Sequence, residues 1–175
     1  MNNYRINSLA KYCFWLFALG LLIFLFWKNY SPLGSQHIVF NLMPNKFISD
    51  INPTARVTPP SCDNETCSQV MFGDPLYFDL LLARKFDLAK IKIYYSSDID
   101  MDLRLGMQTK EGWNYMIKTP DKKDKNVNIS IAEFSFPLSQ ALINKRHVSF
   151  IISAPETKAE NKEITIYKME LDLKR

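Results

Sequence analysis

The chain has 175 residues, of which 47% are hydrophobic, 23% charged and 13% aromatic. This composition is typical of one globular domain and excludes a wholly disordered chain. The net charge is +4, from 22 basic and 18 acidic residues. That balance excludes a protein whose main work is to hold nucleic acid by its phosphates, so no nucleic-acid partner is predicted. With 3 cysteines, a disulfide-dense scaffold is also excluded.

An uncharged apolar run, YCFWLFALGLLIFLFW, occupies residues 12–27. As a helix it would span about 24 Å, less than the roughly 30 Å hydrocarbon core of a bilayer. Leu9 and Ala10 extend the run, and the flanking lysines can snorkel to the interfaces. We predict an uncleaved transmembrane signal anchor over residues 12–30, with residues 12–27 in contact with the lipid bilayer. A cleaved signal peptide and a buried helix of a soluble core are the alternatives.

The N-terminal flank predicts the orientation of this anchor. Arg5 and Lys11 precede the apolar run, and no acidic residue does. By the positive-inside rule, residues 1–11 are predicted to be cytoplasmic and the C-terminal domain extracytoplasmic. Cys62 and Cys67, in PSCDNETCS, are then predicted to form a disulfide in an oxidising compartment. Free thiols are the main alternative, because a metal site would need two further ligands.

Residues 31–60 contain five prolines and no sustained helical period, which predicts a stalk. A strand at 37–42 could pair with the domain, and the segment could equally wrap the domain as an extended arm. Residues 61–175 then show short runs of β type, separated by turns such as the charged DKKDK at 121–125, with one possible helical turn at 137–144. An antiparallel β-sandwich is therefore predicted. Its expected strands are 70–72, 76–83, 90–95, 102–108, 113–118, 127–136, 147–153 and 163–174.

Several of these runs follow one another in a familiar order: KIKIYY, DLRLGMQ, GWNYMIK, EFSFPLSQAL, HVSFIISAP and ITIYKMELDL. Over about residues 70–175 this order is similar to that of galactose-binding-like jelly-roll modules, many of which are carbohydrate-binding modules. The resemblance implies a mostly β, jelly-roll-like sandwich and a possible glycan partner. Because the same architecture also serves as scaffold or partner-binding unit, it leaves the function open.

The sequence predicts no enzyme. It contains no G-x-S-x-G, H-E-x-x-H, P-loop or G-x-G-x-x-G motif. Its histidines are His37, in the predicted stalk, and His147, at the start of a predicted strand. A small hydrolase with two carboxylates is a remote alternative.

Asp98, Asp100 and Asp102 alternate in SSDIDMDLRL and would share one face of a strand. Such a row suits a charged solvent edge that discourages edge pairing, or a structural Ca²⁺ site. The EF-hand pattern is excluded, because its sixth and twelfth positions would be Leu103 and Thr109. No other cofactor is predicted.

Trp113 and Tyr115 are the best candidates for a ligand site. Two positions apart on a strand, they point to the same face. If that face is exposed, they form a platform on which a sugar ring stacks, with hydrogen bonds from Asn114, Arg104 or Gln108. If it is buried, they belong to the core.

The sequence thus predicts a single-pass membrane protein that presents a non-enzymatic β-sandwich at the cell envelope. A docking module for a protein partner in the envelope is the first hypothesis for its function. A lectin-like module for surface glycans is the second, and a small hydrolase is a distant third.

Overall fold

The computed structural model describes residues 3–30, 34–63, 66–97, 102–111, 114–125, 129–159 and 162–175. It divides the chain into two compact units, residues 1–34 and 35–175. The first unit consists of helix α1, Asn3–Tyr30, in which the large apolar side chains from Tyr12 to Phe26 are between 49% and 71% exposed. Among the described residues, no helix is both long enough and apolar enough to cross a membrane. The structure therefore gives the transmembrane span predicted at 12–30 no support.

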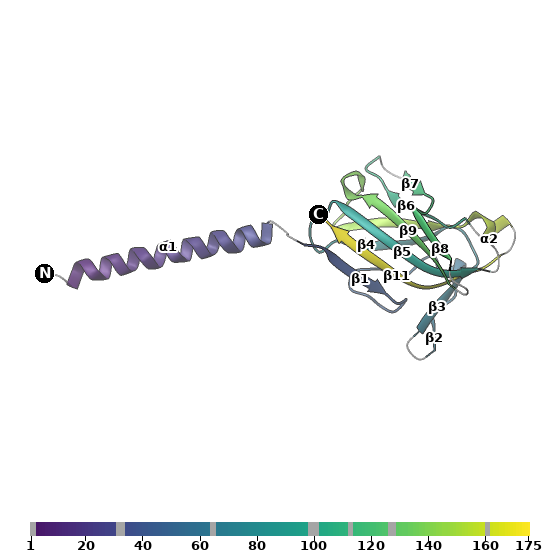
Figure 1. Cartoon of the computed structure of the whole chain (residues 1–175), viewed down its shortest axis with the longest axis horizontal. Coiled ribbons are helices and arrows are strands. Elements are labelled where there is room, and N and C mark those ends of the chain that lie inside the picture. The colour runs from purple at the N-terminus through teal and green to yellow at the C-terminus, as the bar shows by residue number, and fades with distance from the viewer. Residues whose placement is uncertain are drawn as a thin grey trace. The chain divides into compact units, whose positions relative to one another are not determined.

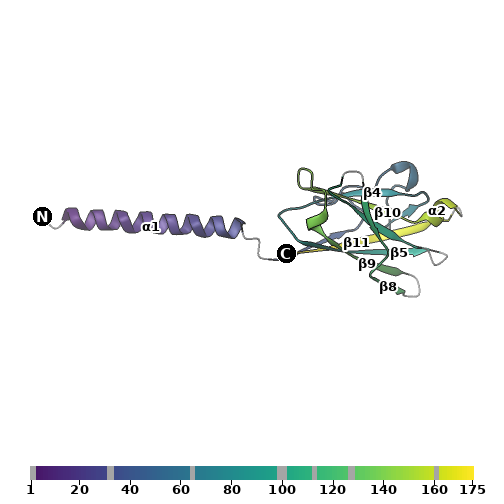
Figure 2. The same ribbon diagram turned by 90° about the horizontal axis from the view of Figure 1, so that it is seen from above.

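The second unit is a sandwich of two antiparallel sheets (Figures 1 and 2). In the described part of the chain, a seven-stranded sheet has the order β2-β3-β11-β5-β9-β8, with β1 also paired to β11, and a four-stranded sheet has the order β4-β10-β6-β7. The strands are β1 Gln36–Phe40, β2 Ser61–Asp63, β3 Thr66–Met71, β4 Leu76–Leu81, β5 Leu88–Ser97, β6 Arg104–Gln108, β7 Tyr115–Lys118, β8 Lys122–Lys125, β9 Ser130–Pro137, β10 His147–Ser153 and β11 Ile164–Lys174. Short helices are η1 Thr54–Arg56, η2 Leu138–Gln140 and α2 Pro155–Ala159.

Alternating apolar residues of the two sheets form one core. In β4, Leu76, Phe78 and Leu80 are buried, and the residues between them face outward. The ring of Phe78 stacks on that of Phe150 in the neighbouring β10, with the centroids 5.3 Å apart. Phe136 of the opposite sheet meets Phe150 edge-on at 5.7 Å. Period-2 alternation in each strand therefore fixes which face of each sheet is left for function.

The segment predicted as a stalk belongs to the sandwich from residue 35 onward. β1 pairs with β11 at the edge of the seven-stranded sheet. The chain then crosses to the other sheet, where Ser49 N donates to Asp79 O at 3.0 Å and Asn52 N donates to Tyr77 O at 2.9 Å. This segment therefore wraps the domain as an extended arm, which was the alternative to a stalk, and we call it the arm. The arm forms hydrogen bonds with backbone groups of the edge strand β4, which would otherwise remain unpaired.

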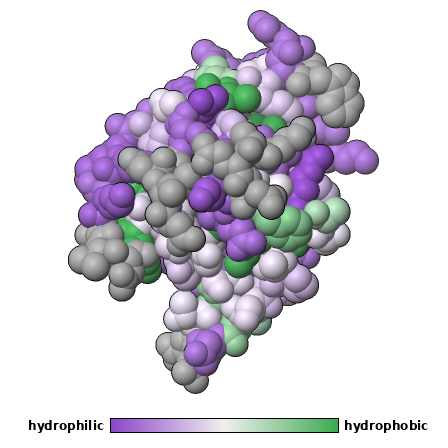
Figure 3. All heavy atoms as spheres, turned by 90° about the vertical axis from the view of Figure 1, so that its right-hand side faces the viewer, coloured by the Kyte–Doolittle hydropathy of each residue, from purple (hydrophilic) through white to green (hydrophobic). Residues whose placement is uncertain are grey.

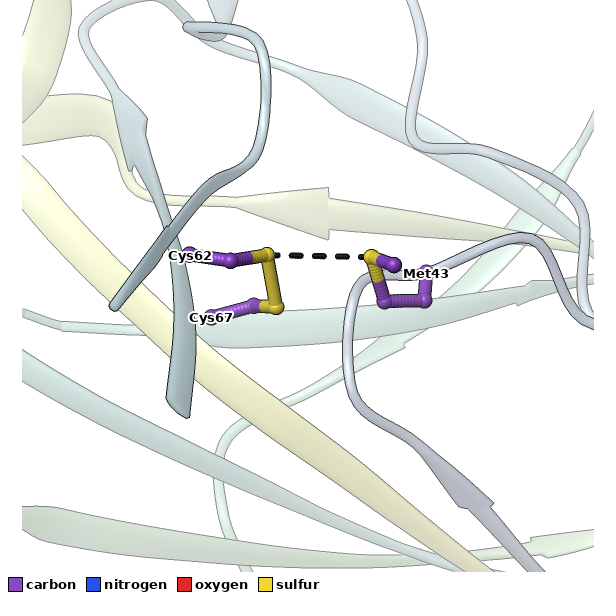
Figure 4. Close-up of a disulfide and its surroundings, with 3 residues drawn as sticks. All are labelled: Met43, Cys62 and Cys67. Carbon is purple, nitrogen blue, oxygen red and sulfur yellow. Dashed lines mark hydrogen bonds between the residues drawn. A yellow bond between two sulfur atoms is a disulfide. The ribbon is translucent and has the colours of Figure 1, made fainter. Parts of the chain in front are cut away.

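One local feature, strand β8, differs from the prediction, and another, the disulfide, agrees with it. The predicted charged turn at 121–125 contains strand β8, whose backbone pairs with β9. Cys62 and Cys67 face each other across the β2–β3 hairpin and form a disulfide. The Sγ of Cys62 also lies 3.7 Å from the Sδ of Met43 in the arm, so sulfur contacts join the hairpin to the arm (Figure 4).

Candidate functional site

The outer face of the four-stranded sheet carries a pair of tyrosines. Tyr77 of β4 lies opposite Ile151 of β10, and Ile151 lies opposite Gly106 of β6. The rings of Tyr77 and Tyr115 lean toward each other, with their centroids 6.4 Å apart and their planes tilted by 54°. Ile117 of β7 continues this surface and is 51% exposed. We call Tyr77, Tyr115, Ile117 and Ile151 the tyrosine platform.

Gly106 makes the close packing of this platform possible. A Cβ at this position would lie 2.5 Å from Cγ2 of Ile151 and 3.0 Å from Cγ1 of Ile117. Real side chains do not tolerate such distances, so any larger residue would push the two isoleucines apart. The missing side chain of β6 lets the neighbours on β10 and β7 close over it, which produces a continuous apolar surface.

Polar side chains of the same face border the platform. The Ser149 hydroxyl donates to Oδ1 of Asp79 at 2.6 Å. Gln108 lies directly opposite Tyr115 in the β6–β7 pair. Arg104 donates to Oδ2 of Asp102 through Nε at 2.8 Å and through a terminal nitrogen at 2.5 Å. An aromatic surface edged by an acid, an amide, a hydroxyl and a guanidinium can combine stacking with directed hydrogen bonds.

The surroundings of Tyr115 reinforce the neutral form that a tyrosine hydroxyl already has at neutral pH. Partial burial raises the pKa of Tyr115, and the neighbouring Tyr77 and Asp79 raise it further. A phenol whose pKa lies above the usual value of 10 stays protonated at neutral pH, so it can both donate and accept a hydrogen bond.

The structure brings together three of the residues that the sequence singled out. Arg104 and Gln108 share the outer face because they alternate with the buried Leu105 and Met107 of β6, and Tyr115 shares it because it lies opposite Gln108 in the β6–β7 pair. Asn114 is exposed just before β7, where its carbonyl accepts from Thr109 N at 2.9 Å. Trp113 lies outside the described residues.

Sequence reasoning missed the contributions of β4 and β10 to this face. Tyr77, Asp79, Ser149 and Ile151 complete it, but both faces of LYFDLLLA are partly apolar, so the sequence left the outward face of β4 undecided. The one available signal was the Asp79 carboxylate, whose charge favours the solvent side of a strand.

The predicted calcium ligands are not assembled in the described part of the chain. Asp98 and Asp100 lie outside the described residues, and Asp102 is paired with Arg104. Among the described residues, no group of three acidic, histidine or cysteine side chains could hold a metal ion.

The two histidines lie on different sheets. His37 Nδ1 is 2.8 Å from Asp172 Oδ1 on the outer face of the seven-stranded sheet. His147 is exposed at the start of β10 in the four-stranded sheet. The pair therefore does not meet in one cleft.

The two packed antiparallel sheets form a β-sandwich whose fold is similar to that of a solved carbohydrate-binding module. The chain matches the CBM22-1 xylan-binding domain of Paenibacillus barcinonensis Xyn10C with a TM-score of 0.51 and 9% identity, over 79% of this chain and 94% of that one. At this identity the likeness establishes the fold alone.

Other solved structures are similar at lower scores. TmCBM27, a carbohydrate-binding module described for mannan recognition, has a TM-score of 0.41 and 7% identity over 80% of this chain and 99% of its own. A family two carbohydrate esterase from Cellvibrio japonicus has a TM-score of 0.40 and 8% identity over 80% of this chain and 34% of its own. No protein-family model and no curated protein sequence matches the chain.

Proposed function

We propose that the sandwich is a non-enzymatic carbohydrate-binding module and that its tyrosine platform is the binding surface. The observation that carries this proposal is the Tyr77–Tyr115 pair, which is partly exposed and bordered by hydrogen-bonding side chains. The apolar C–H face of a sugar ring would stack on the tyrosines. Its hydroxyl groups would bind to Asp79, Gln108 and Arg104.

The shape of the surface supports a polymer as ligand rather than a small isolated molecule. The platform crosses β4, β10, β6 and β7, so the side chains that could contact a ligand extend over four neighbouring strands. A glycan chain that lies across the strands would meet the two rings in succession. The known binding of xylan and mannan by proteins of this fold makes these polymers the first ligands to test.

The test is a glycan array probed with the full chain, purified in a detergent that has no sugar head group. Binding to any selected oligosaccharide is then measured by titration calorimetry. Truncation of a hot-spot aromatic residue costs about 2 kcal/mol or more, and about 1.4 kcal/mol corresponds to a factor of ten in affinity. Tyr115→Ala and Tyr77→Ala should therefore each weaken binding about tenfold or more. Tyr115→Phe should keep most of the stacking.

Val39→Ala is the matched control. Val39 is 40% exposed and Tyr77 is 38% exposed, but Val39 lies on the opposite sheet. Its truncation should leave the affinity unchanged. If the folded chain binds no sugar, or if Tyr77→Ala and Tyr115→Ala bind as well as wild type, the glycan-binding proposal is wrong.

A protein-docking role is the alternative that a negative result would favour. Such a role requires a continuous exposed apolar patch of several hundred Å². On the end of the sandwich that Figure 3 shows, the described apolar residues form separate small areas among hydrophilic ones. We put glycan binding forward because hydrogen-bonding side chains border the tyrosine platform, which suits a sugar better than an apolar protein surface.

We also propose that residues 12–27 attach the sandwich to a lipid bilayer, with residues 1–11 on the cytoplasmic side. The support is the sequence, in which an uncharged apolar run with large side chains such as those of Trp15 and Phe17 follows the basic residues Arg5 and Lys11. Each such side chain gains roughly 1.5–3 kcal/mol when it leaves water. Membrane fractionation tests the attachment. Labelling with a membrane-impermeant reagent, in variants that lack Cys13 and carry a single introduced cysteine among residues 1–11, tests the orientation. Recovery of the whole chain in the soluble fraction would contradict it.

A further inference from the structure

The seven-stranded sheet contains a notch where two short strands share one edge of β11. β3 pairs with Ile164–Ile166, and β1 pairs with Met169–Leu173. Between them, Tyr167 and Lys168 have no strand partner on that edge among the residues that the structure describes. A cavity of about 410 Å³ lies at this point, lined by Asn41, Thr66, Cys67, Tyr94, Ile129, Tyr167 and Lys168. Its volume falls in the range of small-ligand sites, about 300–1,000 Å³.

A β-bulge aims the side chains at the floor of this notch. The register of β11 against β5 shifts between Ile166 and Lys168. Buried residues alternate up to Ile166 and begin again at Met169, so the consecutive residues Tyr167 and Lys168 both lie on the outer face. Bulges of this kind re-aim side chains and occur frequently next to functional sites.

The polar groups on the floor hold one another in place. Tyr94 Oη donates to Glu170 Oε2 at 2.9 Å, and Lys168 Nζ donates to Glu170 Oε1 at 2.8 Å. The Lys168 ammonium also lies over the Tyr94 ring, 4.1 Å from its centroid. The hydroxyl groups of Tyr167 and Ser96 are 2.9 Å apart. A floor that is ordered before a ligand arrives loses less conformational entropy on binding.

The two sides of the notch offer hydrogen-bonding groups that the protein does not use. Within the described residues, the exposed side chains of Asn41, at the end of β1, and Thr66, at the start of β3, make no hydrogen bond to the protein. The disulfide of Cys67 fixes the β3 side. An amide and a hydroxyl thus face the cavity above two tyrosine rings.

We propose that this notch is a second sugar-binding site, which takes one or two residues at the end of a glycan. Aromatic rings with an amide and a hydroxyl suit a polyhydroxylated ring. Because Glu170 balances the charge of Lys168, the site favours a neutral ligand over an anionic one. Strands on two sides limit its length, so a chain end fits where the interior of a long polymer does not. The choice of ligand class rests on the glycan-binding function proposed above.

The test compares short and long ligands on the full chain in a detergent without a sugar head group. Titrations use disaccharides (xylobiose, mannobiose and cellobiose) and the corresponding hexasaccharides. Tyr167→Ala and Asn41→Ala should weaken disaccharide binding about tenfold, while Tyr115→Ala should weaken hexasaccharide binding and leave disaccharide binding at the notch intact. Tyr167→Phe is the matched control for the ring, and melting temperatures verify that each variant is folded.

The outcomes separate the two proposals. If disaccharide binding survives Tyr167→Ala but is lost in Tyr115→Ala, all binding takes place at the platform and the notch is not a sugar site. If hexasaccharides bind in a Tyr115-dependent manner and no disaccharide binds, the notch proposal fails while the proposed function stands. If no sugar binds to the folded chain, both fail.

Discussion

Substitution of Gly106 by alanine tests the packing on which the tyrosine platform depends. In a strand, glycine is roughly 0.5–1 kcal/mol less stable than alanine, so at an open position Gly106→Ala would stabilise the protein. Here the new Cβ would lie 2.5 Å from Cγ2 of Ile151. That methyl is fixed to a nearly buried side chain and cannot simply rotate away. Overpacking of this kind costs about 1–3 kcal/mol, which outweighs the gain. The substitution should therefore be destabilising.

The assays are urea denaturation and thermal denaturation of the full chain, both followed by far-ultraviolet circular dichroism. A loss of 1 kcal/mol lowers the melting temperature by about 2–4 °C in a protein of this size. A double-mutant cycle with Ile151→Ala identifies the cause. Because Ile151→Ala removes the clashing methyl group, Gly106→Ala should cost much less stability in that background. The coupling free energy between the two substitutions should be about 0.5–3 kcal/mol. If Gly106→Ala stabilises the wild-type protein, or if the two effects are additive, the close packing over β6 is wrong.

Three further predictions concern stability, each measured by denaturation of the full chain. Replacement of Cys62 and Cys67 by serine opens a loop with a sequence separation of 5 and should cost about 2 kcal/mol; an unchanged midpoint would contradict the entropic argument. Lys118 Nζ donates to Ser135 O at 2.9 Å, and this hydrogen bond links the two sheets. Lys118→Ala should therefore cost about 1–2 kcal/mol of stability. Lys122→Ala, which removes an exposed ion pair, should have almost no effect. Burial alone would raise the pKa of Glu170, but the hydrogen bonds from Lys168 and Tyr94 outweigh burial and leave that pKa below 4.5. Ionised Glu170 therefore adds stability above pH 4.5, and this stability is lost on acidification. The wild-type melting temperature should fall more steeply than that of Glu170→Gln in this acidic range, and parallel curves would refute the linkage.

Strands with clean alternation could be predicted closely from the sequence. HVSFIIS, predicted at 147–153, is β10, and the alternating run that ends the chain is β11. In β10 one face is consistently apolar, so the pattern alone indicates the buried side. In β11 the same holds on either side of the bulge at Tyr167 and Lys168. The disulfide is also local, because its two cysteines lie on one hairpin.

Features that depend on distant contacts could not be predicted in this way. The arm at 35–60 contains prolines and lacks a period, so its sequence is that of a stalk. Its backbone nevertheless pairs with β11 and β4, which lie far along the chain. Similarly, β8 is so rich in lysine that it was predicted as a turn. The neighbouring β9 supplies the backbone partner, and the charged side chains remain in solvent.

The candidate site combines local and long-range information. The alternation in DLRLGMQ and WNYMIK places Arg104, Gln108 and Tyr115 on one side of their hairpin, which sequence reasoning could propose. The meeting of Tyr115 with Tyr77 depends on the register of β10 between β4 and β6. No local pattern encodes that register. The role of Gly106 likewise becomes visible only when its neighbours on the adjacent strands are known.

The most direct test of the central claim is ¹⁹F NMR of the full chain labelled with fluorotyrosine. The chain has 8 tyrosines, and single Tyr→Phe variants assign their resonances. Titration with the oligosaccharide that binds best should shift the signals of Tyr77 and Tyr115 together, with one saturation curve, and should leave that of Tyr12 in place. Saturable binding that moves neither Tyr77 nor Tyr115 would contradict the claim that the tyrosine platform holds the glycan.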